Sequence, residues 1–320
     1  MIEKYKLAYQ EVKNRFGEEY PYFSLLVLSL YGLLTKYSSY QDIVIEVFQN
    51  TDFYIDQDDL YSIINKNSIP IIDFFEDDNN IEEELKDVPA ISSTGKYLET
   101  KEQQIQLVEK KPFIACSYNN HTEPSILLNC FVHEFSHLIK AHHQSYFEEE
   151  DELEDSHYLR GGIQFYKYSY LKEQEIMEEN SYFTSIDEVI NVIETTETLE
   201  IIKDLDGLVP DKRIQSFLNQ LDEETLKKDY GYNDAVKVFR PLWEIESFRN
   251  IVEENIVEGN ISRIIEEFSS ISSRHTFLEL SSMIEDVDNY LDDDTIEDAK
   301  YLISDICKDI IEQIKVKKRK

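Results

Sequence analysis

Residues 122–140 read TEPSILLNCFVHEFSHLIK, and they predict the helix on which the fold depends. Pro124 suits the first turn of a helix, where its missing N–H leaves no hydrogen bond unmade. No Gly or Pro interrupts the stretch from there to Lys140. Apolar side chains at 127, 128, 131, 132, 135, 138 and 139 cover much of the helix surface. We therefore expect a helix that is buried on most of its sides.

Two histidines and a glutamate lie within this helix. His133 and His137 are four residues apart, so their imidazoles share one face and can bind a single Zn²⁺. Glu134 then lies beside the metal and can take a proton from its bound water. Such polar groups on a buried helix need a partner, and a metal supplies one. The alternative is a core helix in which the histidines donate to backbone carbonyls and Glu134 pairs with a cation.

A catalytic zinc site usually has three protein ligands and an open position for water, so a third ligand is needed. His143 is one candidate, but it requires the chain to turn near Lys140. A residue other than glycine takes the left-handed conformation only at a cost of roughly 1–2 kcal/mol. Glu188 is the other candidate, because residues 183–194 have the pattern of the start of a second amphipathic helix. We expect Glu188 to be the ligand.

Residues 110–200 resemble the gluzincins, the thermolysin-like zinc peptidases, in which a helix downstream of HExxH supplies a glutamate ligand. The resemblance implies that His133, His137 and Glu188 hold Zn²⁺ and that Glu134 is the general base. HExxH is the specific part of this likeness, and Asp187-Glu188 takes the place of the short Asn-Glu or similar pair that opens the second helix in that family.

The chain departs from both zincin patterns at identifiable positions. His143 has the spacing of the third metzincin ligand, but Lys140 stands where that family has glycine. Val192 stands where gluzincins have an aspartate that orients a zinc-bound histidine. Asn191 or Thr195, about one helical turn along, could reach the same space.

Glu188 has a second interpretation. Ser185 and Glu188 have the spacing of a capping box, in which Ser185 is the N-cap and the glutamate accepts from its backbone N–H. One carboxylate cannot easily do both jobs. If Glu188 caps the helix, zinc needs His143 or another residue.

Composition limits the kinds of partner. The 320 residues include 32 Lys and Arg against 66 Asp and Glu, a formal charge of −34. Such a surface repels nucleic acid and anionic membranes and favours cationic partners. The peptidase interpretation, not the charge, implies a peptide or protein substrate. Hydrophobic residues make up 41% of the chain, which is too many for a disordered protein. The sequence leaves the oligomeric state open.

Cysteine usage and the N-terminal sequence indicate a cytoplasmic protein. Cys116, Cys130 and Cys307 are far apart and form no CxxC pair, which favours a reducing compartment. Cys130 lies one turn before His133, where packing is the expected role. No signal peptide is recognisable, and the apolar run at 22–34 is too short to span a bilayer.

The chain divides by pattern into three regions. Residues 1–90 are expected to be helical, with helices at 5–16, 23–37, 40–49 and 58–65 and an acidic linker at 75–87. Residues 91–200 form the expected zincin-like core, with strands at 105–108 and 112–118, a solvated acidic loop at 147–155, and a strand at 158–168 opened by Gly161 and Gly162. Residues 201–320 are again expected to be helical, with helices that include 248–258, 261–271 and 295–316.

Several residues are candidates to line the cleft. The strand at 112–118 either pairs with an extended peptide or is simply buried. A donor for the oxyanion could come from Arg160, His157 or the tyrosines near them, or from His275 or Tyr232.

The sequence thus predicts a predominantly helical α+β protein, with a zincin-like catalytic region of small sheet and active-site helix between helical N- and C-terminal regions. The predicted activity is that of a zinc metallopeptidase. The alternative is a non-catalytic acidic interaction or regulatory protein with a vestigial or structural metal site.

Overall fold

The structure is a computed structural model. It describes residues 2–70, 81–85, 88–101, 104–118, 123–174, 176–221, 233–271 and 276–288, together with 301, 304–306, 308, 309, 312 and 316. Most of the predicted linker at 75–87 and of the predicted helix at 295–316 lies outside these residues. The fold is α+β, as the sequence predicts.

The chain forms two compact units. The first comprises Met1–Tyr97, Glu109–Ile139 and Glu194–Lys228, and the second comprises Leu98–Val108, Lys140–Ile193 and Asp229–Lys320. A search of the described helices finds no segment with the length and hydrophobicity that a bilayer crossing requires.

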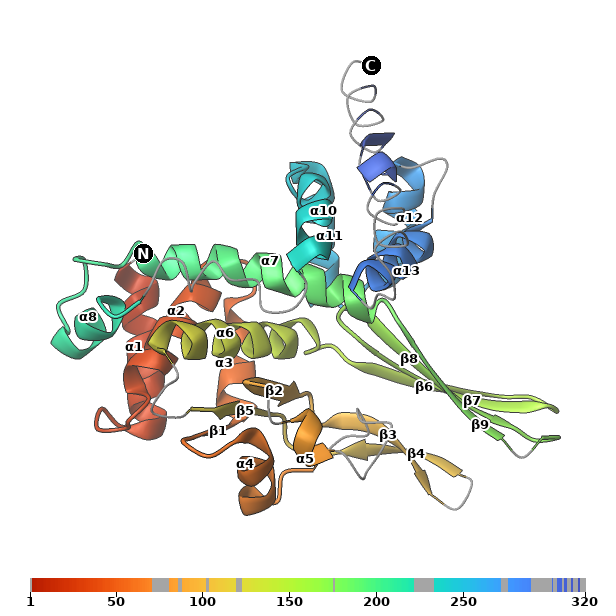
Figure 1. The fold of residues 1–320 in the computed structure, drawn as a ribbon, viewed down its shortest axis with the longest axis horizontal. Coiled ribbons are helices and arrows are strands. Elements are labelled where there is room, and N and C mark those ends of the chain that lie inside the picture. The colour runs from red at the N-terminus through yellow and green to blue at the C-terminus, as the bar shows by residue number, and fades with distance from the viewer. Residues whose placement is uncertain are drawn as a thin grey trace. The chain divides into compact units, whose positions relative to one another are not determined.

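The first unit begins with the helices α1 (Ile2–Phe16), α2 (Phe23–Lys36) and α3 (Gln41–Asn50), followed later by α4 (Leu60–Asn67), α5 (Ile81–Glu84) and α8 (Lys212–Leu218) (Figure 1). The four helices predicted for residues 5–65 are confirmed within a few residues at each end. Every residue of α2 from Leu25 to Leu34 is buried, because that segment is apolar on all sides. Asp59 caps α4 by accepting from the backbone N–H of Ser62.

A three-stranded sheet forms the centre of the first unit. Its order is β1 (Asp52–Asp56), β5 (Phe113–Ser117) and β2 (Ala90–Ser93), with β5 parallel to β1 and antiparallel to β2. The strand predicted at 112–118 is therefore the central one, paired on both sides. The suggestion that it pairs with a peptide is wrong, because its backbone groups are already used within the sheet.

The helix predicted at residues 124–140 is confirmed as α6 (Pro124–Lys140). It packs on one face of the three-stranded sheet, where the ring of Phe53 lies 5.3 Å from that of Phe131 and 6.1 Å from that of Phe135, between centroids. The other face of the sheet packs against α4 through Phe113 and Ala115. Aromatic packing thus holds α6 against the sheet. The apolar residues of α6 at 127, 128, 131, 132, 135, 138 and 139 are all buried, as the sequence predicts.

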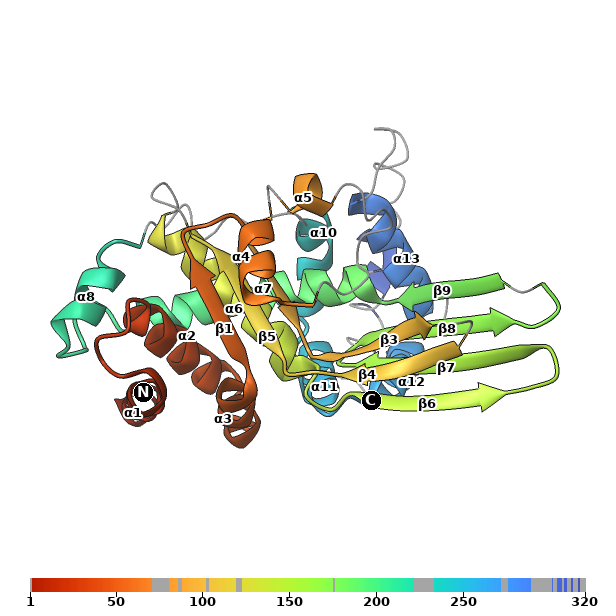
Figure 2. The ribbon, with the colours of Figure 1, turned by 90° about the horizontal axis from the view of Figure 1, so that it is seen from below.

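The second unit contains a two-stranded sheet, β3 (Lys96–Lys101) with β4 (Gln104–Glu109), and a four-stranded antiparallel sheet (Figure 2). The latter is formed by β6 (Ser145–Glu150), β7 (Glu154–Gly161), β8 (Gln164–Leu171) and β9 (Ile176–Tyr182). The solvated loop predicted at 147–155 is wrong for residues 147–150 and 154–155, which pair in β6 and β7; only residues 151–153 form an exposed loop. The ring of Phe147 stacks on that of Tyr158 at 4.5 Å, and the glutamates of β6 are exposed. The charged side chains are thus exposed to solvent, as expected, but the backbone that carries them is a β-strand and not a loop.

A long helix, α7 (Thr184–Lys203), follows β9, and α10 (Asn233–Trp243), α11 (Glu246–Val257), α12 (Ile261–Ile271) and α13 (Phe277–Asp288) complete the described elements. The expected helices at 248–258 and 261–271 are confirmed as α11 and α12. The first half of α7 shares a buried apolar cluster with these four helices. The division between the two units falls within α7, after Ile193.

Candidate metal centre

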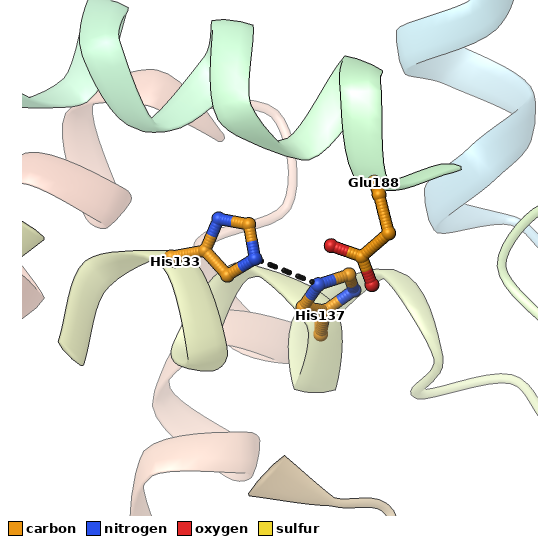
Figure 3. Close-up of side chains that lie close together, drawn as sticks. All are labelled: His133, His137 and Glu188. Carbon is orange, nitrogen blue, oxygen red and sulfur yellow. Dashed lines mark hydrogen bonds between the residues drawn. The ribbon is translucent and has the colours of Figure 1, made fainter. Parts of the chain in front are cut away.

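Two imidazoles from α6 and one carboxylate from α7 converge (Figure 3). The Nε2 atoms of His133 and His137 are 3.2 Å apart. One ligand atom from each of His133, His137 and Glu188 lies within 4.8 Å of the other two, and all three side chains are half-buried. The structure therefore brings together the three residues that the sequence predicts as ligands.

The spacing of these atoms fits a zinc ion. Zn–N bonds of 2.0–2.1 Å at a tetrahedral angle put two ligand nitrogens about 3.3 Å apart. The imidazole nitrogens, at 3.2 Å, already have this separation. A carboxylate oxygen within 4.8 Å would have to approach by at most about 1.5 Å, which rotation about the side-chain torsions of Glu188 allows.

Glu134 lies next to the two histidines in sequence and has a fixed partner. The Ser92 hydroxyl on β2 donates to its Oε2 at 2.7 Å. A hydrogen bond to a carboxylate is short and strong, so it orients the group. No sequence pattern points to Ser92, which lies 42 residues from Glu134 on a strand that the sequence does not predict.

His143 does not belong to the group. The chain stays helical through Lys140, and among the described non-glycine residues only Ser68 and Phe183 have positive φ. His143 is exposed, and its carbonyl oxygen packs against Gly259. The turn that a metzincin-like third ligand needs is therefore not formed.

The start of α7 also differs from the predicted capping box. The helix begins at Thr184, directly after Phe183 with φ 65°, so Ser185 is its second residue and not its N-cap. The interpretation of Ser185 and Glu188 as a capping box is wrong for this reason.

The surroundings of Val192 explain why this chain has a valine where gluzincins have an aspartate. Val192 is 6% exposed and belongs to the apolar cluster with α10–α13. An aspartate there would place a charge among hydrocarbon side chains. Asn191 and Thr195, the alternatives on the same helix, are both buried.

Cys130 is also buried near this site but outside the group of three. Burial, with a smaller contribution from the charge of Glu134, raises the pKa of its thiol to about 12. A thiol of this kind behaves as a small apolar side chain, which is the role expected from the sequence.

Two of the expected oxyanion donors are engaged within the four-stranded sheet. Nδ1 of His157 lies 2.7 Å from the Tyr146 hydroxyl. The guanidinium of Arg160 lies over the ring of Phe165, 5.7 Å from its centroid.

Tyr166 of the four-stranded sheet has a pKa that is affected by two carboxylates of α7. Burial raises its pKa well above the ordinary value, and the negative charges of Asp187 and Glu188 raise it further. Its hydroxyl donates to Oε1 of Gln164 at 2.8 Å. His275 and Tyr232 lie outside the described residues.

Comparison of the chain with family models, with curated proteins and with solved structures finds no match.

Proposed function

We propose that this chain is a gluzincin-like zinc metallopeptidase, with residues 91–200 as its zincin-like core. The observation that supports this most strongly is the approach of the Glu188 carboxylate to the imidazoles of His133 and His137. A helix with HExxH needs a third donor from elsewhere in the chain, and this carboxylate comes from α7.

The number of donors favours catalysis over a structural role for the metal. Structural zinc sites are closed by four protein ligands, whereas catalytic sites have three and an open position. Among the described residues the group contains three such side chains. A structural metal site, one form of the non-catalytic alternative, would need a fourth protein ligand.

Glu134 is the proposed general base. When bound, zinc supplies Lewis acidity that polarises a carbonyl group and makes water more acidic. Glu134 takes the proton of the attacking water and passes it to the departing amine. Ser92 holds the carboxylate through the hydrogen bond at 2.7 Å while it exchanges that proton. Asn191 or Thr195 is proposed to orient an imidazole.

An extended peptide is the proposed substrate, and β2 is where it would lie. This strand pairs with β5 along one edge, and none of the described strands pairs with its other edge. A peptide can add to such an edge through main-chain hydrogen bonds. Because β2 also carries Ser92, a peptide bound there would pass close to Glu134.

Glu134→Gln tests the activity. The amide keeps the size of the side chain but cannot act as a base, so the variant should bind zinc normally and cleave no member of a peptide library. Glu200→Gln, an exposed position on α7, is the matched control and should leave cleavage unchanged. Cleavage that persists in Glu134→Gln would show that the assigned mechanism is wrong.

A further inference from the structure

A buried ion pair involves the helix residue next to the third ligand. Lys140 Nζ lies 3.4 Å from Asp187 Oδ1, with the two side chains 2% and 5% exposed. Lys140 is the last residue of α6, three residues after His137. Asp187 immediately precedes Glu188 in the first turn of α7.

The surroundings of the pair complete its burial. Gln164 Nε2 donates to the other oxygen of Asp187 at 3.3 Å. Gly162 has φ +61°, and a Cβ atom there would come within 3.2 Å of the Lys140 carbonyl oxygen. The turn between β7 and β8 thus lies against the end of α6, and a Cβ at Gly162 would be in tight contact with it.

Stability alone does not account for a pair buried this deeply. Removing two charges from water costs several kcal/mol per ion, and apolar residues of similar volume often give an equal or more stable protein. The helix dipoles favour a cation at the end of α6 and an anion at the start of α7, but by only about 0.3–1 kcal/mol each. In some proteins a buried polar or ionic group instead specifies one arrangement of the elements that it joins.

A second polar contact holds α7 further along. The Tyr37 hydroxyl donates to Glu194 Oε2 at 3.1 Å and lies 2.7 Å from the Ser136 hydroxyl on α6. Tyr37, Ser136 and Glu194 are all buried. Glu188 therefore lies on a helix that is held by buried polar contacts at position 187 and again at position 194.

From this arrangement we infer that Lys140 and Asp187 are positioning residues, which fix the first turn of α7 so that the Glu188 carboxylate reaches the two imidazoles. The inference rests on the proposed function in one respect: it takes Glu188 to be a zinc ligand. Neither residue belongs to the group of three possible ligands, so both act through Glu188.

The test replaces both charges and measures zinc affinity. K140M/D187N removes the ion pair but keeps an amide that can bond to Gln164. We expect the zinc dissociation constant, measured by competition with a chromophoric chelator, to rise about 10–100-fold, as when an outer-shell partner of a ligand is lost. Thermal unfolding of the metal-free variant shows whether it folds. If it does not fold, K140M/D187L, with an apolar pair, takes its place.

Two further variants separate positioning from general support of the fold. K36M/E197Q removes another ion pair of α7, at 2.5 Å, and should leave zinc affinity unchanged. In an E188A background, K140M/D187N should cause no further loss of affinity, because the pair acts only through Glu188.

The zinc affinities of these variants distinguish a failure of the positioning role from a failure of the zinc site. Wild-type affinity in K140M/D187N, or an equal loss of affinity in the E188A background, would overturn the positioning role and leave the zinc site standing. A wild-type chain that binds no zinc would overturn both the zinc site and the inference. A loss of affinity that disappears in the E188A background supports the inference.

Discussion

Shortening the third ligand by one methylene should disrupt the proposed metal site almost as much as removing it. In the structure the ligand atom of Glu188 lies within 4.8 Å of those of the two histidines. Tetrahedral zinc requires about 3.3 Å, so the glutamate closes a gap of up to about 1.5 Å by rotating its side chain. Glu188→Asp withdraws the carboxylate by one carbon–carbon bond, about 1.5 Å, and the gap doubles.

The expected loss follows from the number of ligands. Zinc sites with four protein ligands bind with about 10–16 kcal/mol, or about 3 kcal/mol for each ligand. At 1.4 kcal/mol for each factor of ten, losing one ligand weakens zinc binding roughly 100-fold. We expect Glu188→Asp and Glu188→Ala to show losses of this size, within a few-fold of each other, in a titration against a chromophoric zinc chelator.

The matched control lies on the same helix. Glu200 is exposed near the end of α7, so Glu200→Asp should bind zinc like the wild type. If Glu188→Asp and Glu188→Ala both keep wild-type affinity, Glu188 is not a ligand. A selective loss in Glu188→Ala alone would mean that the helix moves enough to bring a shorter side chain to the ion.

Three other outcomes follow from described contacts. Ser92→Ala removes the 2.7 Å hydrogen bond to Glu134, so peptide turnover should fall about tenfold or more while zinc affinity stays the same; equal turnover would show that the contact does not position the base. Burial raises the pKa of Cys116 well above its ordinary value and that of Cys130 to about 12, so both thiols are protonated at pH 8. With the third cysteine changed to serine, the native protein should not react with a thiol reagent until it is unfolded, and rapid reaction in the native state would contradict this burial. A Cβ at Gly32 would lie 2.8 Å from side chains of α7, so Gly32→Ala should lower the free energy of unfolding by about 1–3 kcal/mol in a denaturant titration, whereas unchanged stability would mean that the two helices are not in close contact.

Elements with a strong local pattern were predictable from the sequence. The run from Pro124 to Lys140 has a start residue, no break and a wide apolar surface, and α6 has those bounds. The amphipathic pattern after residue 183 likewise predicts α7, although the helix starts one residue before the expected cap. Since the motif lies on α6, the side chains of His133 and His137 were expected to share one face.

Features that depend on contacts between distant segments were not predictable. The glutamates of β6 indicate a solvent-exposed loop, yet the strand forms through pairing with β7. β2 has only four residues, too few for a clear alternation, so neither the strand nor the contact from Ser92 to Glu134 is predictable. The ion pair of Lys140 is not predictable either, because its partner Asp187 lies beyond the whole four-stranded sheet in sequence.

X-ray absorption at the zinc edge of the zinc-loaded chain reports the type and number of atoms bound to the ion. For a site formed by His133, His137 and Glu188 we expect one zinc per chain, with two imidazole nitrogens at about 2.0–2.1 Å and carboxylate or water oxygens at about 2.0–2.2 Å. Loss of one oxygen ligand is expected in Glu188→Ala. Sulfur in the coordination shell, or a chain that retains no zinc, would contradict a site of this kind.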